Sequence, residues 1–226
     1  MWALRINRVM HELRTGGVSA VARYVAERLV RKNSFLVFVT DLHQPWPTYP
    51  CPDGYTVRLI TGMEGRDIDR LLQFWMTFYA DNYPLFYDER LVRKLLEARF
   101  AAGELCFVAE HGDDIAHFHW ISRFGRCDLN REEPLKFLPF RPGRDAYAYN
   151  LFTRPDYRGK GLILATHSFL CEYLRQQGCE QVLTCVGIKN TASIKVHRRI
   201  AVQVGTLHVV RYLVFDRARM VPVQGG

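Results

Sequence analysis

The 226-residue sequence predicts an α/β protein in which strands and helices alternate along the chain. Apolar residues make up 48% of the chain and aromatic residues 13%, which is ample for a buried core. Between Tyr55 and Phe215, runs with the spacing of strands alternate with runs whose apolar residues recur at helical spacing. In the second half, a glycine-rich turn at residues 157–162 joins one such strand to a helix.

The first 50 residues are predicted to form a basic appendage with a helix and a strand, and residues 51–226 to form the main domain. Residues 1–32 contain seven Lys or Arg and two Asp or Glu, so they carry +5 of the net charge of +8. Apolar residues recur at helical spacing from Val18 to Leu29, and residues 35–39 are typical of a buried strand. Four prolines mark residues 41–54 as an extended linker.

Two arrangements are open for this appendage. Its helix can dock on the main domain, with residues 35–39 adding a strand to the edge of the sheet. Alternatively, residues 1–32 can lie on an anionic membrane surface. We favour docking, because an apolar strand left exposed would be prone to pair with other chains.

The elements of the main domain follow in order. Strands are predicted at residues 55–60, 105–110, 115–123, 147–153 and 181–186, with a strand pair at 202–215. Helices are predicted at residues 66–79, 88–101, 162–175 and 190–200. Asp88 is a suitable N-cap for the second helix, and Gly103 ends that helix. The turn at residues 111–114 is typical of a hairpin, whereas residues 124–144 form a long connection.

The sequence gives no indication of a membrane span or of export. It contains no run of ~18 uncharged apolar residues, and charged residues interrupt the N-terminal stretch where a signal peptide needs an apolar core. The six cysteines include no C-x-x-C pair, so zinc spacing is absent and no metal site is expected. A reduced, cytoplasmic compartment fits this cysteine usage best.

The turn Tyr157-Arg-Gly-Lys-Gly-Leu162 has the chemistry of a phosphate site. A glycine-rich turn before a helix presents several backbone N–H groups in one direction, and the helix dipole adds partial positive charge there. Arg158 and Lys160 add mobile cations. Similar residues also occur in plain surface turns, so the turn alone leaves both interpretations open.

A second motif, Asn190-Thr-Ala-Ser193, opens another predicted helix one strand later. Together the two motifs resemble the GCN5-related N-acetyltransferase (GNAT) superfamily. The cofactor motif of that family, Gln/Arg-x-x-Gly-x-Gly/Ala, aligns with Arg158, Gly161 and Ile163. The resemblance extends over residues 55–215 in order and length, and its specific motifs lie in the second half.

This resemblance implies a mixed, mostly antiparallel central sheet of about seven strands, with helices on both faces and a splayed strand pair for acyl-CoA. It also implies acetyl-CoA, or another acyl-CoA, as donor and an amine as acceptor. The cofactor-binding residues that it implies are Leu151, Phe152, Thr153, Arg158, Gly159, Lys160, Gly161, Leu162, Ile163, Asn190 and Ser193. Asn190 also suits a helix N-cap, and both roles can hold at once.

Three positions depart from the family pattern. Ile163 stands where the family has a small residue, so either the helix begins farther from the pyrophosphate or this side chain points away. Ala201-Val202 replaces a Gly-Phe pair, and His197 replaces a tyrosine that the family often carries. These departures concern cofactor geometry and proton transfer, and they leave the expected fold unchanged.

Acyl transfer of this kind needs a backbone N–H for the oxyanion, a base for the amine and, less strictly, an acid for the thiolate. The resemblance places the oxyanion donor in a bulged strand at residues 149–153. It also suggests His197 as the acid, because imidazole titrates near neutral pH. The alternative for His197 is a structural histidine on the helix surface or against a neighbouring tyrosine.

Three residues are candidates for the base. His119 lies on the same face of a predicted strand as His117. The two histidines could instead be core residues or metal ligands. Glu110 at the end of the preceding strand and Asp145 before the predicted oxyanion strand are the other candidates.

The acceptor remains open between a small amine, an amino sugar, a peptide and a protein lysine. Tyr83 and Phe86 lie between the first two helices, where the family builds a wall of the acceptor pocket. Alternative functions are a non-catalytic acyl-CoA-binding module and a relative that uses aminoacyl-tRNA. Nucleic acid is not the expected partner, because the basic N-terminal segment lacks interleaved aromatic residues. The sequence leaves a homo-oligomer open.

Overall fold

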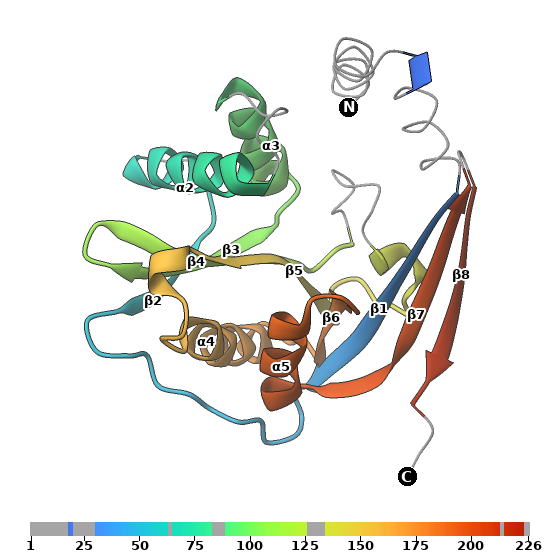
Figure 1. Cartoon of the computed structure of the whole chain (residues 1–226). Coiled ribbons are helices and arrows are strands. Elements are labelled where there is room, and N and C mark those ends of the chain that lie inside the picture. Colours follow the sequence, from blue (N-terminus) through green and yellow to red (C-terminus); the bar gives the residue numbers. More distant parts are fainter. Residues whose placement is uncertain are drawn as a thin grey trace.

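A computed structural model describes residues 18–19, 30–62, 65–82, 89–125, 134–212 and 215–223. The chain forms an eight-stranded sheet in the order β2-β3-β4-β5-β6-β1-β7-β8 (Figure 1). The strands are β1 (Val30–Asp41), β2 (Thr56–Ile60), β3 (Leu105–His111), β4 (Asp114–Ser122), β5 (Asp145–Thr153), β6 (Gln181–Gly187), β7 (Val202–Tyr212) and β8 (Phe215–Pro222). The helices are α2 (Arg66–Asn82), α3 (Glu89–Ala101), α4 (Leu162–Gln176) and α5 (Thr191–Ile200), with short 3₁₀ turns η1 (Pro134–Phe137) and η2 (Pro155–Tyr157).

The sheet is mixed and mostly antiparallel, as predicted. Every neighbouring pair of strands is antiparallel except β5 and β6, which run parallel. Helices α2 and α3 lie on one face of the sheet, and α4 and α5 lie on the other (Figure 1). The connection from β5 to β6 passes through α4, as parallel neighbours require.

Two apolar clusters fix strands β3 to β5 between these helix layers. On the α2 side, the rings of Trp75 and Phe118 stack at 5.3 Å between centroids, and Trp120 is fully buried beside them. On the α4 side, Leu170 packs with Phe107 and other buried residues of the sheet. Because β4 and residues 145–149 of β5 are buried, they give a rigid frame for the residues that follow in β5.

Strand β1 lies inside the sheet, and the prediction that it adds to the sheet edge is wrong. It pairs with β6 from Phe35↔Gly187 to Asp41↔Gln181, and it pairs with β7 along its other edge. Its side chains are covered on both faces, because Phe38 packs with Ile194 of α5 while Val37 joins the α2-side cluster. The apolar pattern of residues 35–39 fits an interior strand as well as an edge strand, so the sequence could not separate them.

The linker after β1 crosses the outside of α4. Its first residue donates a hydrogen bond from the Leu42 N–H to the Glu180 carbonyl oxygen at 2.8 Å. Farther on, the Tyr49 N–H donates to Ser168 Oγ at 2.8 Å, and the Tyr49 hydroxyl donates to the Arg199 carbonyl oxygen at 3.3 Å. The linker therefore ties α4 to α5, and the proposed division of the chain at residue 50 stays a prediction.

We predict that Phe38→Ala lowers the free energy of unfolding by about 3–5 kcal/mol, because the side chain is fully buried and its removal leaves a cavity. Urea denaturation would measure this change. Val202→Ala at the start of β7 is the control, since Val202 is 69% exposed and its change should stay within about 0.5 kcal/mol. Equal stabilities for the two variants would contradict an interior β1.

Candidate active site

Strands β5 and β6 separate halfway along their length. Their parallel pairing runs only from Asp145↔Gln181 to Ala148↔Thr184. Beyond this point β5 continues to Thr153, while β6 continues to Gly187 and stays paired with β1 on its far side. Among the described residues, no strand pairs with the β6-facing edge of β5 after Ala148, so its backbone groups can bind a ligand. This is the predicted splayed strand pair.

A β-bulge lies at the opening of this gap. Phe118 of β4 pairs with Phe152, but Trp120 pairs with Tyr149, so β5 holds one extra residue between these pairs. Asn150 in the bulge has φ 43°, the one positive φ of a non-glycine residue in the described part of the chain. Asparagine tolerates this left-handed conformation better than most residues. The bulge falls within residues 149–153, where the family resemblance placed it.

The turn before α4 carries a row of unpaired backbone donors. Gly159 and Gly161 have φ angles of 78° and 77°, which only glycine adopts without strain. Helix α4 begins at Leu162 directly after Gly161, so its first N–H groups point out of the helix end. Within the described chain, no acceptor takes a hydrogen bond from the N–H groups of residues 159–163. The turn is therefore suited to a pyrophosphate.

The two cations of the turn lie beside aromatic rings. Arg158 Nε donates to the Thr153 carbonyl oxygen at 3.2 Å, and its guanidinium lies 5.7 Å from the Phe152 ring centroid. Lys160 Nζ donates to the Tyr55 hydroxyl at 3.0 Å, which raises the pKa of Lys160. Both side chains are exposed, so they can move onto an anion.

The second motif forms the start of α5. Asn190 Oδ1 accepts a hydrogen bond from the Ser193 N–H at 3.1 Å, so Asn190 is an N-cap. A contact of Asn190 or Ser193 with the cofactor stays a prediction. One turn later, His197 is buried against Phe38, with 5.6 Å between ring centroids.

The hydrogen bonds of His197 do not fit its predicted role as an acid. Its Nδ1 lies 2.8 Å from the Ser193 carbonyl oxygen, and a carbonyl oxygen can only accept. The ring proton is therefore on Nδ1, which leaves a lone pair on Nε2. Burial lowers the pKa of His197, against a smaller opposite effect of the Ser193 bond, so the ring is neutral at pH 7. Such a ring must take up a proton at Nε2 before it can donate one there.

His119 lies directly opposite the bulge. Phe118 pairs with Phe152 and Trp120 pairs with Tyr149. His119, which lies between Phe118 and Trp120, therefore faces Asn150 and Leu151 of β5. Both ring nitrogens are buried without a hydrogen-bond partner, and burial lowers the pKa of His119 well below 6.5. The neighbouring His117 is held by a 2.8 Å contact between its Nδ1 and Thr153 Oγ1.

The other two candidate bases are held in ion pairs. Both oxygens of Glu110 take hydrogen bonds from Arg58 at 2.8 Å, and Arg70 lies 2.8 Å away. Burial would raise the pKa of Asp145, but hydrogen bonds from Arg141 outweigh it and hold that pKa below its usual value. Asp145 also begins β5, five residues and roughly 16 Å before the bulge. Both placements favour structural roles.

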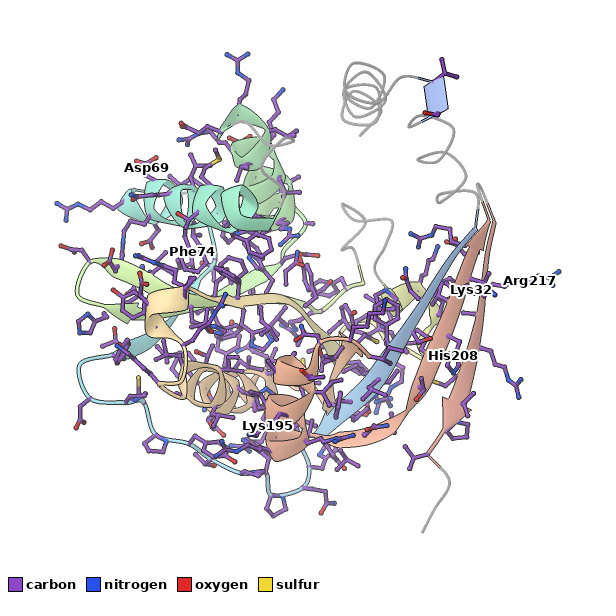
Figure 2. The ribbon with its side chains drawn as sticks, viewed as in Figure 1. Lys32, Asp69, Phe74, Lys195, His208 and Arg217 are labelled. Carbon is purple, nitrogen blue, oxygen red and sulfur yellow. The ribbon has the colours of Figure 1, made fainter. Side chains whose placement is uncertain are left out.

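Aromatic residues line the α2 face of the bulge; Phe152 was predicted as a cofactor-binding residue, whereas Phe74, Phe78 and Trp120 were not among the predicted site residues. On the α2 face, Phe152 lies 4.8 Å from Phe78 and 5.7 Å from Phe74 between ring centroids, and Phe74 points from α2 toward the sheet (Figure 2). Trp120 Nε1 and the Tyr149 hydroxyl, which flank the bulge, are buried without a hydrogen-bond partner. Tyr149 begins the strand at residues 149–153 that the resemblance predicted to hold the oxyanion donor. The predicted acceptor residues Tyr83 and Phe86 lie outside the described residues.

Among the described residues, no group of three or more His, Cys, Asp or Glu is placed so that it could hold a metal ion. No helix in the described ranges is long and apolar enough to span a bilayer.

The buried histidines make stability depend on pH. Burial lowers the pKa of both His117 and His167 from 6.5 to about 3, so the unfolded chain binds more protons than the folded chain in acid. Their contribution is complete above pH 6.5 and is lost as the pH falls toward 3. We expect each to destabilise the fold by about 2 kcal/mol between about pH 7 and pH 5.

Urea unfolding at the two pH values would measure this loss. His167→Gln should reduce the pH dependence, whereas His208→Gln at an exposed position of β7 should retain it. An unchanged pH dependence in His167→Gln would show that His167 is not buried in its neutral form.

Comparison with known proteins agrees with this geometry. The sequence profile described as "Acetyltransferase (GNAT) family" matches residues 71–201. A mycothiol acetyltransferase of Saccharopolyspora erythraea is 25% identical over 150 residues, which cover 66% of this chain and 44% of that protein. An L-methionine sulfoximine/L-methionine sulfone acetyltransferase of Pseudomonas paraeruginosa is 28% identical over 125 residues, 54% of this chain and 59% of that protein. The chain thus spans about half the length of these curated relatives.

Solved structures share the fold at low sequence identity. A GCN5-related N-acetyltransferase from Sphaerobacter thermophilus superposes with a TM-score of 0.51 at 14% identity, covering 92% of this chain and 58% of that one. The family profile covers more than half of the chain and includes β3 to α5, which build the splayed strands, the bulge and the turn. The chain therefore belongs to the acetyltransferase (GNAT) family.

Proposed function

We propose that this protein transfers an acetyl group from acetyl-CoA to the amine of a small molecule. The observation that carries the proposal is the row of unpaired N–H groups at residues 159–163, placed beside the gap between β5 and β6. A pyrophosphate needs several donors and partial positive charge at one point, and this turn supplies both. The open edge of β5 offers further backbone groups to an extended arm.

The proposed roles of the chain follow from this placement. The turn at residues 159–163 holds the pyrophosphate, with Arg158 and Lys160 as mobile cations. Residues 151–153 bind the arm through their open backbone edge. Acetyl-CoA supplies an activated thioester carbonyl. A backbone N–H at the bulge would stabilise the oxyanion, because a fixed dipole costs no reorganisation when charge develops.

Proton transfer is assigned to neutral histidines. An attacking amine must lose a proton, and a neutral imidazole with an unshared nitrogen can accept it. We place His119 first as this base, since it lies opposite the bulge and both of its nitrogens are free of hydrogen bonds. Its ring is on the α4 side of the sheet, so a proton from the acceptor would reach it through the opening between β5 and β6. His197 is the second candidate, through the lone pair on Nε2. A ring protonated in this way could then return the proton to the departing thiolate.

The acceptor is proposed to approach from the α2 face. Aromatic rings of Phe78 and Phe152 line that face, and the Tyr149 hydroxyl and Trp120 Nε1 offer polar contacts beside the bulge. The relatives named for mycothiol and for methionine sulfoximine support a small-molecule acceptor. The non-catalytic alternative predicts acetyl-CoA binding without turnover against a panel of amines.

Gly161→Glu tests the cofactor site. It places bulk and negative charge at the turn, so we expect acetyl-CoA binding, measured by calorimetry, to be lost together with turnover. Gly178→Glu is a matched control, because both glycines are exposed, both have φ 77° and neither has an atom within 4 Å of an added Cβ. Equal affinity in two folded variants would refute the proposed site.

His119→Gln tests the proposed base. Loss of a general base typically costs 10²–10⁴ in rate, so we expect kcat to fall about 100-fold with little change in acetyl-CoA affinity. The deficit should shrink at high pH, where more of the amine is already deprotonated, and a purely structural defect would not recover in this way. His208→Gln should keep wild-type kcat. Unchanged kcat in His119→Gln would remove His119 from the mechanism.

A further inference from the structure

Strands β1, β7 and β8 carry a set of exposed cations on one face of the sheet. Lys32, Val210 and Arg217 pair across the three strands, and Ser34, His208 and Arg219 form the next row. Paired residues and residues two apart share a face, so all six side chains lie on one side. We call these six residues the basic face. Figure 2 shows Lys32, His208 and Arg217 on these strands.

The basic face is open to solvent. Lys32, His208, Arg217 and Arg219 are all exposed. Helix α5 covers the same side of the sheet only farther along β1, where Leu36 and Phe38 pack with Ile194. Beyond this contact, β7 and β8 extend away from the helices (Figure 1).

The acidic residue of this region is turned away from the basic face. Asp216 is the one Asp or Glu among residues 187–226, which contain seven Lys or Arg. It pairs with Arg211 on the opposite face, where its carboxylate accepts a hydrogen bond from Arg211 Nε at 2.8 Å and also contacts Lys136. Residues 33–186, in contrast, contain 17 Lys or Arg and 20 Asp or Glu. Of the seven basic residues, Arg211, Arg217 and Arg219 lie on β7 and β8, whereas the other four lie in α5 or just before it. By register, none of the residues on the basic face is acidic.

Aliphatic side chains border the basic face. Ile188, whose N–H donates to the Ser34 carbonyl oxygen at 3.1 Å, is 48% exposed. Val221 pairs with Thr206 in the row after Ser34 and His208, and it is 38% exposed. Cations next to exposed aliphatic groups match the boundary between headgroups and acyl chains of an anionic bilayer.

Other occupants fit less well. A second copy would bring like charges together, and so would residues 1–31 of the same chain, which contain six Lys or Arg and two Asp or Glu. Single-stranded nucleic acid is bound through stacking on aromatic rings, and the six residues of the basic face offer only His208. A nucleic acid would also leave Ile188 and Val221 without apolar partners.

We propose that the basic face docks the protein on an anionic phospholipid surface. The cations contact lipid phosphates and carboxylates, while Ile188 and Val221 reach the acyl boundary. The bulge and the turn at residues 159–163 lie outside the basic face, so docking sets the location of the protein and leaves its chemistry unchanged.

Co-sedimentation of the full chain with vesicles tests the proposal. We expect binding to phosphatidylcholine–phosphatidylserine vesicles, reduced by salt, and none to phosphatidylcholine alone. The triple variant Lys32→Gln/Arg217→Gln/Arg219→Gln should bind roughly 100-fold more weakly, since each basic residue near the surface raises the affinity for an anionic membrane about fivefold. The control Arg66→Gln/Arg90→Gln/Lys94→Gln removes equal charge from exposed positions of α2 and α3 and should bind nearly as the wild type.

Three outcomes would overturn the proposal. The wild type could fail to bind the anionic vesicles, or the two triple variants could lose binding equally. Tighter binding of duplex RNA than of vesicles, lost in the first triple variant alone, would assign the basic face to nucleic acid. Unchanged unfolding curves in both variants would show that a loss of binding does not reflect misfolding.

Discussion

The separation of β5 from β6 after Ala148 and Thr184 is the constraint on which the proposed chemistry depends. Beyond this point β5 and β6 share no hydrogen bonds, so their other neighbours in the sheet must hold them in place. On one side, β4 pairs with β5 beyond the opening, and the bulge at Asn150 bends the strand. On the other side, β1 pairs with the whole of β6, from Gln181 to Gly187. Strand β1 therefore helps to keep the gap open, although it lies far from the turn at residues 159–163 in sequence.

Two different electrostatic environments meet at this gap. The turn at residues 159–163 collects backbone donors and exposed cations, which favours an anion at the surface. Behind the bulge, His117, His119, His167 and His197 are buried, and burial lowers the pKa of each. These imidazoles are neutral and keep a lone pair that can accept a proton, but the lowered pKa also makes each of them a weaker base. A protonated imidazole there would be destabilised, which favours rapid return of the proton.

The sequence was most informative where chemistry is local. The Gly159 to Gly161 turn and the Asn190 cap follow from short motifs, and both form as predicted. Long-range placement could not be read in the same way, because the apolar run of β1 fits either an edge or an interior strand. The proton position on His197 depends on a carbonyl one helical turn away, and the ion pairs of Glu110 depend on arginines of other elements. Such partners are set by tertiary contacts.

Hydrogen exchange of the backbone amides at residues 159–163 shows directly whether these N–H groups are unpaired and whether acetyl-CoA binds to them. NMR would follow each amide with and without acetyl-CoA, with Leu170 in the buried middle of α4 as an internal reference. We expect fast exchange at residues 159–163 without acetyl-CoA, marked slowing there when acetyl-CoA is bound, and slow exchange at Leu170 throughout. Amides that are already protected without acetyl-CoA, or that are unchanged by it, would contradict the assignment of this turn to the pyrophosphate.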